Sequence, residues 1–167
     1  MSEPLSTFVS RYLQDRPGLE AALDHPVLLH NSSDARRTAG HMQTMSVMDV
    51  PPSGGELLVV PVRKEKENAF QRGVTVGRTG NNDLVIIGDG SISRFHAWFQ
   101  RDAATGDWTL VDAGSKNGTH LNGERLPVKK PVVLPPEANL KFGSIEVRFL
   151  TPPAFLKFLE QVAIDGA

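Results

Sequence analysis

Between residues 74 and 126 the chain alternates short β-type runs with turns, and this alternation constrains its fold more than any other feature. The runs are Val74–Val76, Leu84–Ile87, His96–Phe99 and Trp108–Val111. Segments rich in glycine, serine and asparagine separate them. Short strands repeated at this spacing are typical of a β-sandwich or barrel. We therefore predict an all-β domain.

Three of the turns carry side chains that suit phosphate binding. They hold G-R at residues 77–78, S-R at 93–94 and S-K-N at 115–117. Loops two strands apart in a meander lie at the same end of the sheet, so we expect the second and third turns to be neighbours. The run at 84–87 is short, which lets Arg78 reach the same end. Two arginines, a lysine, a serine hydroxyl and an amide would then converge on one surface.

The order of these blocks resembles the forkhead-associated (FHA) domain. The blocks are G-R at 77–78, S-R-F-H at 93–96, S-K-N-G-T at 115–119 and L-N-G at 121–123. With its flanking strands, the resemblance covers residues 56–150. It implies an FHA-like β-sandwich with short flanking α-helices, of a bacterial type with helical N- and C-terminal extensions. It also implies that loops at one end bind phosphothreonine peptides.

The resemblance implies five peptide-binding residues. Arg78 and Ser93 would contact the phosphate, since a guanidinium donates two parallel hydrogen bonds to such a group. Arg94 and Lys116 would add positive charge, at positions where relatives carry other polar residues. Asn117 would hold the peptide main chain, because an amide both donates and accepts hydrogen bonds.

Four other residues are implied to support the site. Gly77 would permit the turn, and His96 would brace the loop from behind. Gly118 and Asn122 belong to Asn-Gly pairs, which are strong hairpin signals even without a ligand.

The remaining sequence divides the chain into four parts. These are an N-terminal helical segment at 1–29, a flexible linker at 30–55, the FHA-like domain at 56–150 and a C-terminal helix at 151–167. Leu5, Phe8, Val9, Tyr12 and Leu13 recur at helical spacing. The first helices would pack on the sandwich or on a second copy, or would dock a partner. Thr151 would cap the last helix.

Composition excludes several classes of protein. The chain has 167 residues, a formal net charge of −1 and no cysteine. The near-neutral charge disfavours general nucleic-acid binding, and the lack of cysteine excludes disulfides and thiolate metal sites. Neither a signal peptide nor an apolar run of about 20 residues is visible. We predict a cytoplasmic protein with no membrane segment, no metal and no cofactor.

The predicted function is that of a signalling adaptor in Ser/Thr phosphorylation rather than an enzyme. One alternative is an assembly module that does not read phosphate. The other is a hydrolase, because Ser93, His96 and Asp112 are the residue types of a catalytic triad. The sequence lacks the G-x-S-x-G elbow that usually presents such a serine.

The linker offers a possible ligand within the chain itself. Arg36-Arg37-Thr38 resembles a site for a Ser/Thr kinase that prefers basic residues, and Thr44 is a second candidate. Either phosphothreonine could bind the site in the same molecule. The alternative is a passive spacer, which linkers of this composition usually are.

Overall fold

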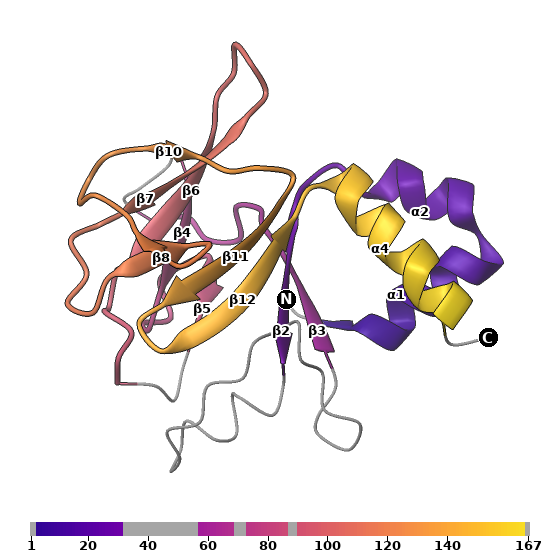
Figure 1. The fold of residues 1–167 in the computed structure, drawn as a ribbon, viewed down its shortest axis with the longest axis horizontal. Helices are drawn as coiled ribbons and strands as arrows, with labels where there is room; N and C mark the ends of the chain where they lie inside the picture. The colour runs from indigo at the N-terminus through magenta and orange to yellow at the C-terminus, as the bar shows by residue number, and fades with distance from the viewer. Residues whose placement is uncertain (1–2, 32–56, 69–72, 87–89, 166–167) are drawn as a thin grey trace.

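The computed structural model describes residues 3–31, 57–68, 73–86 and 90–165 (Figure 1). Most of the predicted linker, including Thr38 and Thr44, lies outside these residues. His30 and Asn31, at its predicted start, belong to a strand.

Two sheets face each other, as the predicted β-sandwich requires. The larger sheet has the order β1-β3-β2-β12-β11-β8-β9 and the smaller one β10-β7-β6-β4-β5. The strands of the larger sheet are β1 (Glu3–Pro4), β2 (Val27–Asn31), β3 (Leu57–Pro61), β8 (Thr119–Leu121), β9 (Glu124–Arg125), β11 (Glu137–Phe142) and β12 (Ile145–Leu150). Those of the smaller sheet are β4 (Val74–Gly77), β5 (Leu84–Val85), β6 (Ala97–Arg101), β7 (Trp108–Asp112) and β10 (Val132–Val133).

The strand β2 was not predicted, because it falls across the boundary between the segment assigned to helices and the predicted linker. It lies between β3 and β12 and pairs with both. Its sequence, V-L-L-H-N, shows no alternation of apolar and polar residues, since both of its faces are covered. The sandwich therefore takes strands from residues 3–31 as well as from the predicted 56–150.

The hairpin β8–β9 was also absent from the predicted strands, although its turn was recognised. His120 pairs with Arg125 and Leu121 with Glu124, which leaves Asn122 and Gly123 as the two turn residues. Both have positive φ, at 50° and 88°. This is the backbone that Asn-Gly favours in a tight hairpin.

The core between the two sheets is aromatic and aliphatic. Phe99 and Phe149 stack with ring centroids 5.8 Å apart, and Phe142 lies edge-on to Phe99. All three side chains are fully buried. They join β6 of the smaller sheet to β11 and β12 of the larger one.

A second core lies between the larger sheet and three helices, α1 (Leu5–Gln14), α2 (Arg16–Ala22) and α4 (Pro152–Asp165). Along β2, Leu28 enters the sandwich core while Val27 and Leu29 enter this second core. Phe8 of α1 meets Phe155 of α4 at 5.4 Å. The terminal helices thus pack on the sandwich, which was one of the predicted alternatives.

These helices cover only part of the larger sheet. Figure 1 shows them to one side of the sandwich, beyond β12, with β8 and β11 left clear. None of the helices in the described ranges is long and apolar enough to cross a membrane.

Candidate functional site

The three predicted turns meet at one end of the sandwich. The backbone N–H of Arg78 donates to the carbonyl of Ser93 at 3.0 Å, which joins the first turn to the second. The backbone N–H of Lys116 donates to Ser93 Oγ at 3.1 Å, which joins the third. Arg78, Arg94, Lys116 and Asn117 are exposed, and Ser93 is half-buried. The predicted convergence is therefore present.

Arg78 is held in place by one of its own donors. Its Nε donates to the carbonyl of Ile92 at 3.1 Å. The two terminal nitrogens make no hydrogen bond to any residue of the described ranges. A guanidinium fixed at Nε keeps its end-on pair of donors for a ligand, and that pair matches two oxygens of a phosphate.

The Ser93 hydroxyl retains a free proton donor. Its oxygen accepts the Lys116 N–H, and a hydroxyl can accept and donate at the same time. The hydroxyl proton can therefore point to a bound anion. The ammonium of Lys116 makes no ion pair with the part of the chain that the structure describes.

His96 connects the second and third turns from below. Its ring is fully buried; Nδ1 accepts the Ser93 N–H at 3.1 Å and Nε2 lies 2.9 Å from the Gly118 carbonyl. A carbonyl only accepts, so Nε2 carries the ring proton. Burial lowers the pKa of His96, although the Gly118 carbonyl and Asp112 act in the opposite direction. The neutral ring therefore fits both contacts.

The side-chain amide of Asn117 is held by one hydrogen bond. Its Nδ2 donates to the carbonyl of Ser91 at 2.9 Å. Ser91 in turn accepts the Ser144 N–H at Oγ, 2.9 Å away, in the turn between β11 and β12. The Oδ1 and the second N–H of Asn117 make no hydrogen bond to the residues that the structure describes.

Gly77 allows a close approach of two backbone segments. A Cβ at this position would lie 2.0 Å from the carbonyl oxygen of Arg94. The same oxygen accepts a hydrogen bond from Nδ2 of buried Asn82 at 2.7 Å. Asn82 thus holds the second turn against the first, a role that its place in a turn cluster did not reveal.

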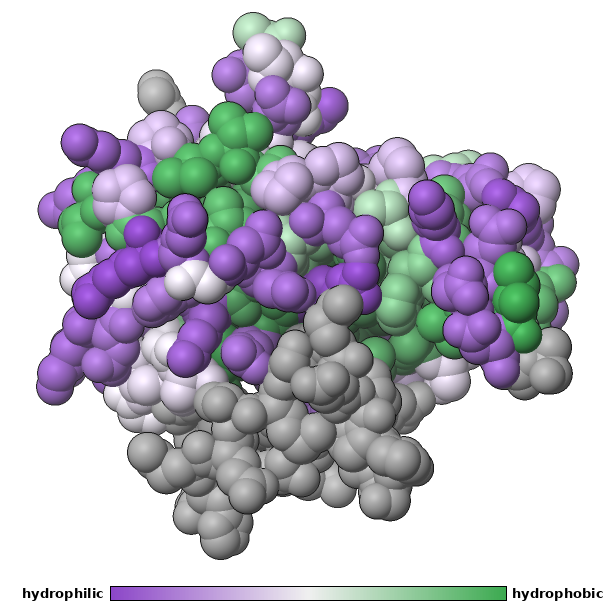
Figure 2. All heavy atoms as spheres, viewed as in Figure 1, coloured by the Kyte–Doolittle hydropathy of each residue, from purple (hydrophilic) through white to green (hydrophobic). Residues whose placement is uncertain are grey.

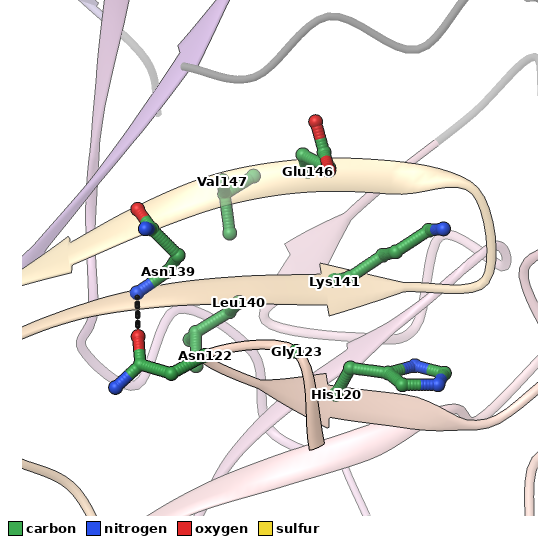
Figure 3. A pocket seen from close by; sticks show the side chains of 8 residues that line it. All are labelled: His120, Asn122, Gly123, Asn139, Leu140, Lys141, Glu146 and Val147. Carbon is green, nitrogen blue, oxygen red and sulfur yellow. Dashed lines mark hydrogen bonds between the residues drawn. The ribbon is translucent and has the colours of Figure 1, made fainter. Parts of the chain in front are cut away.

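Gly118 and Asn122 also have structural reasons for their identity. Gly118 has φ +86°, and a Cβ there would lie 2.8 Å from Arg125 Nε. Asn122 has φ 50°, and its Oδ1 accepts the Asn139 N–H at 2.8 Å, which links the β8–β9 turn to β11 (Figure 3).

Asp112 organises the third turn, and we did not predict this role. The residue is 1% exposed. It accepts hydrogen bonds from Ser115 Oγ at 2.6 Å and Thr119 Oγ1 at 2.7 Å, and from the N–H groups of Gly114 and Ser115. Burial alone would raise the pKa of Asp112, but these donors outweigh it and hold the pKa below its usual value. The short D-A-G-S sequence was the signal, since aspartate often caps such turns.

The arrangement of Ser93, His96 and Asp112 is not that of a hydrolase triad. His96 bonds to the backbone of Ser93 and Gly118, whereas a triad histidine bonds to the serine hydroxyl and the carboxylate. The oxygens of Asp112 are occupied by the third turn. These residues hold loops together. Within the described ranges, no group of three or more His, Asp or Glu residues is placed to hold a metal ion.

Comparisons with known proteins identify the family of the chain. A family model described as "FHA domain" matches residues 74–143. The "Glycogen accumulation regulator GarA" of Mycolicibacterium smegmatis is 33% identical over 126 residues, covering 74% of this chain and 76% of the relative. The "Oxoglutarate dehydrogenase inhibitor" of Corynebacterium efficiens is 33% identical over 122 residues, covering 70% of this chain and 80% of the relative.

A solved structure has a similar fold at low sequence identity. It is the N-terminal FHA domain of Rad53p from S. cerevisiae, in complex with a phosphothreonine peptide. The TM-score is 0.53 at 14% identity, and the match covers 80% of this chain and 98% of that one.

Proposed function

The chain belongs to the family of FHA-domain proteins, and from this premise we propose that it binds phosphothreonine peptides through the loops that meet at Ser93. Arg78 and Ser93 contact the phosphate, Arg94 and Lys116 add charge around it, and Asn117 holds the peptide main chain. A phosphothreonine carries nearly two negative charges and three acceptor oxygens. The site offers three exposed cations, a hydroxyl and an amide to match them.

The observation that carries the proposal is the hydrogen bond from the Lys116 N–H to Ser93 Oγ. It places a hydroxyl between two loops, beside an arginine whose terminal nitrogens are free of the described residues. An isolated surface arginine or serine has no such neighbours. A purely structural sandwich would have no need for this combination of unpaired donors.

In the cell, we propose that the protein acts as an adaptor in the cytoplasm. A Ser/Thr kinase would mark a partner protein, and this chain would bind the marked threonine. The names of its relatives, a regulator and an inhibitor, support regulation through binding. They do not require a reaction at the site itself.

The test is a calorimetric titration with a phosphothreonine peptide and its unphosphorylated twin. Only the phosphorylated peptide should bind. Arg78→Ala should lower the affinity at least tenfold, because hydrogen bonds to charged groups contribute roughly 1.5–3 kcal/mol each. Arg101→Ala is the matched control, since Arg101 is exposed at the opposite end of β6. Equal affinity for the two peptides would refute the proposal.

We further propose that the segment between β2 and β3 supplies a ligand when Thr38 or Thr44 is phosphorylated. Asn31 and Leu57, which bound this segment, are cross-strand partners. Both residues lie near the start of β12. That end of β12 follows the β11–β12 turn, in which Ser144 contacts Ser91 of the site. Thr38 is seven residues beyond Asn31, a span of up to about 25 Å when extended. Both ends of the segment therefore lie at the end of the larger sheet that carries the site.

A further inference from the structure

Part of the outer face of the larger sheet, beginning at the candidate site, is not covered by the helices of the described ranges. Its strands β2 and β3 are covered by the helices, whereas the outward side chains of β8, β9 and β11 are not. Figure 2 looks onto this side of the molecule, where hydrophilic residues dominate the described part of the surface. A groove on this face is lined by residues of β8, β11 and β12 and of the β8–β9 turn, among them His120, Lys141 and Glu146.

One cross-strand row connects the groove to the site. Arg125 pairs with His120, His120 with Lys141, and Lys141 with Glu146. Residues directly opposite each other in antiparallel strands point to the same face. The neighbours of Lys141 in β11, Leu140 and Phe142, enter the sandwich core, so this row points outward.

Arg125 brings the row into contact with the phosphate-binding loops. Its Nε, Cζ and Nη2 would lie 2.8, 3.1 and 3.3 Å from a Cβ on Gly118. The guanidinium therefore rests against the residue that follows Asn117. Arg125 thus links the row to the loop that carries Asn117.

The groups of the row lack partners among the described residues. Arg125 and Lys141 form no ion pair within residues 3–31, 57–68, 73–86 and 90–165. The Nδ1 atom of His120 is buried and has no hydrogen-bond partner within the same ranges. Figure 3 shows His120 and Lys141 on adjacent strands with their side chains leaning the same way. The row has one carboxylate, that of Glu146, at the end farthest from Arg125.

We propose that this row binds an acidic flank of the phosphopeptide, outside the phosphate-binding loops, so that the protein selects partners with carboxylates near the phosphothreonine. The inference rests on the proposed function of the loops. Adjacent strands lie about 4.8 Å apart, so Arg125 and Lys141 are about 10 Å apart across β8. An extended peptide covers that distance in about three residues. Side chains of an extended peptide alternate between its two faces, so two acidic side chains that are two or four positions apart would point to the same side and meet the two cations. The long Glu, Arg and Lys side chains make up the remaining few ångströms.

The test compares phosphothreonine peptides that differ only in their flank. One series carries two Glu residues, two or four positions apart, on the N-terminal or on the C-terminal side of the phosphothreonine, and its partner series carries Gln at the same positions. For Glu residues on one of the two sides, the Glu series should bind the wild type more tightly than the Gln series. The expected gain is about two- to fivefold for each ion pair, because exposed ion pairs make small contributions to binding. Arg125→Gln and Lys141→Gln should each remove part of that gain. Arg101→Gln, far from the row, should leave it unchanged.

A charge reversal distinguishes direct contact from a general field. Lys141→Glu should weaken the Glu series and strengthen a matching series with Lys, whereas a remote effect would not reverse the preference. A peptide with a second phosphate in place of one Glu shows whether the row prefers to bind carboxylates or phosphates. If Glu and Gln series bind the wild type within twofold of each other on both sides, the inference is wrong and the proposed function stands. If no phosphothreonine peptide binds, the proposed function itself fails.

Discussion

The carbonyl of Gly118 lies 2.9 Å from Nε2 of His96, and this contact ties the third site loop to a ring that also holds the second. The loops themselves are exposed, but the group that fixes their spacing is fully buried. Binding geometry and folding stability therefore depend on the same imidazole.

Folding stability should decrease when the solution is acidified below neutrality. Burial lowers the pKa of His96 in the folded protein below its usual value of about 6.5. As the pH falls through that value, the unfolded chain takes up the proton first, so the stabilisation is complete above about 6.5 and declines below it. Urea unfolding between pH 8 and 5 measures the slope.

The slope should be shallower in His96→Gln, whatever that variant's stability at pH 8. His30 is the matched case, because burial lowers its pKa too. The double variant with His30→Gln should lose most of the dependence in this range. An identical slope in wild type and His96→Gln would contradict the assignment of a neutral, buried ring.

Gly77→Ala should disturb the site and the fold together. The added methyl would meet the Arg94 carbonyl at 2.0 Å, and the second turn would have to move. Such overpacking costs about 1–3 kcal/mol. Gly80→Ala is the control three residues away, with no heavy atom within 4 Å of the new methyl. Thermal unfolding and peptide titration should show a large loss for the first variant and almost none for the second. Similar behaviour of the two would mean that the close approach is unimportant.

The sequence predicted the β-sandwich and the meeting of its three turns, but it did not predict every strand. Arg78, Ser93 and Asn117 stand in short local motifs, and such motifs fix turns through neighbouring residues alone. Strand β2 could not be found in this way, because burial on both faces removes its alternation. The position of Arg125 beside Gly118 could not be predicted either. Its contact with Gly118 depends on the register of β8 and β9, and no local sequence pattern predicts that register.

Asn117→Ala should weaken phosphopeptide binding about tenfold while the phosphate contacts stay. The variant removes hydrogen bonds to the peptide main chain and the bond to the Ser91 carbonyl. Asn117→Asp should be worse, because it also places a carboxylate beside the phosphate. Calorimetry against one phosphothreonine peptide ranks the three proteins. Binding of the alanine variant within twofold of wild type would exclude the main-chain role.

Phosphorylation of the segment between β2 and β3 should close the site to other ligands. A phosphothreonine at 38 on a short tether has an effective concentration on the order of millimolar, so it should occupy the site and lower the affinity for an external phosphopeptide at least tenfold. The measurement uses full-length protein carrying phosphothreonine at position 38, or at 44, in the titration. The control is Arg78→Ala, followed by NMR: phosphorylation should change the spectrum of the site loops in the wild type and leave it unchanged in this variant if the contact uses the site. Unchanged affinity in the phosphorylated wild type would leave the segment as a spacer. Self-association that rises with protein concentration would mean that the contact forms between molecules.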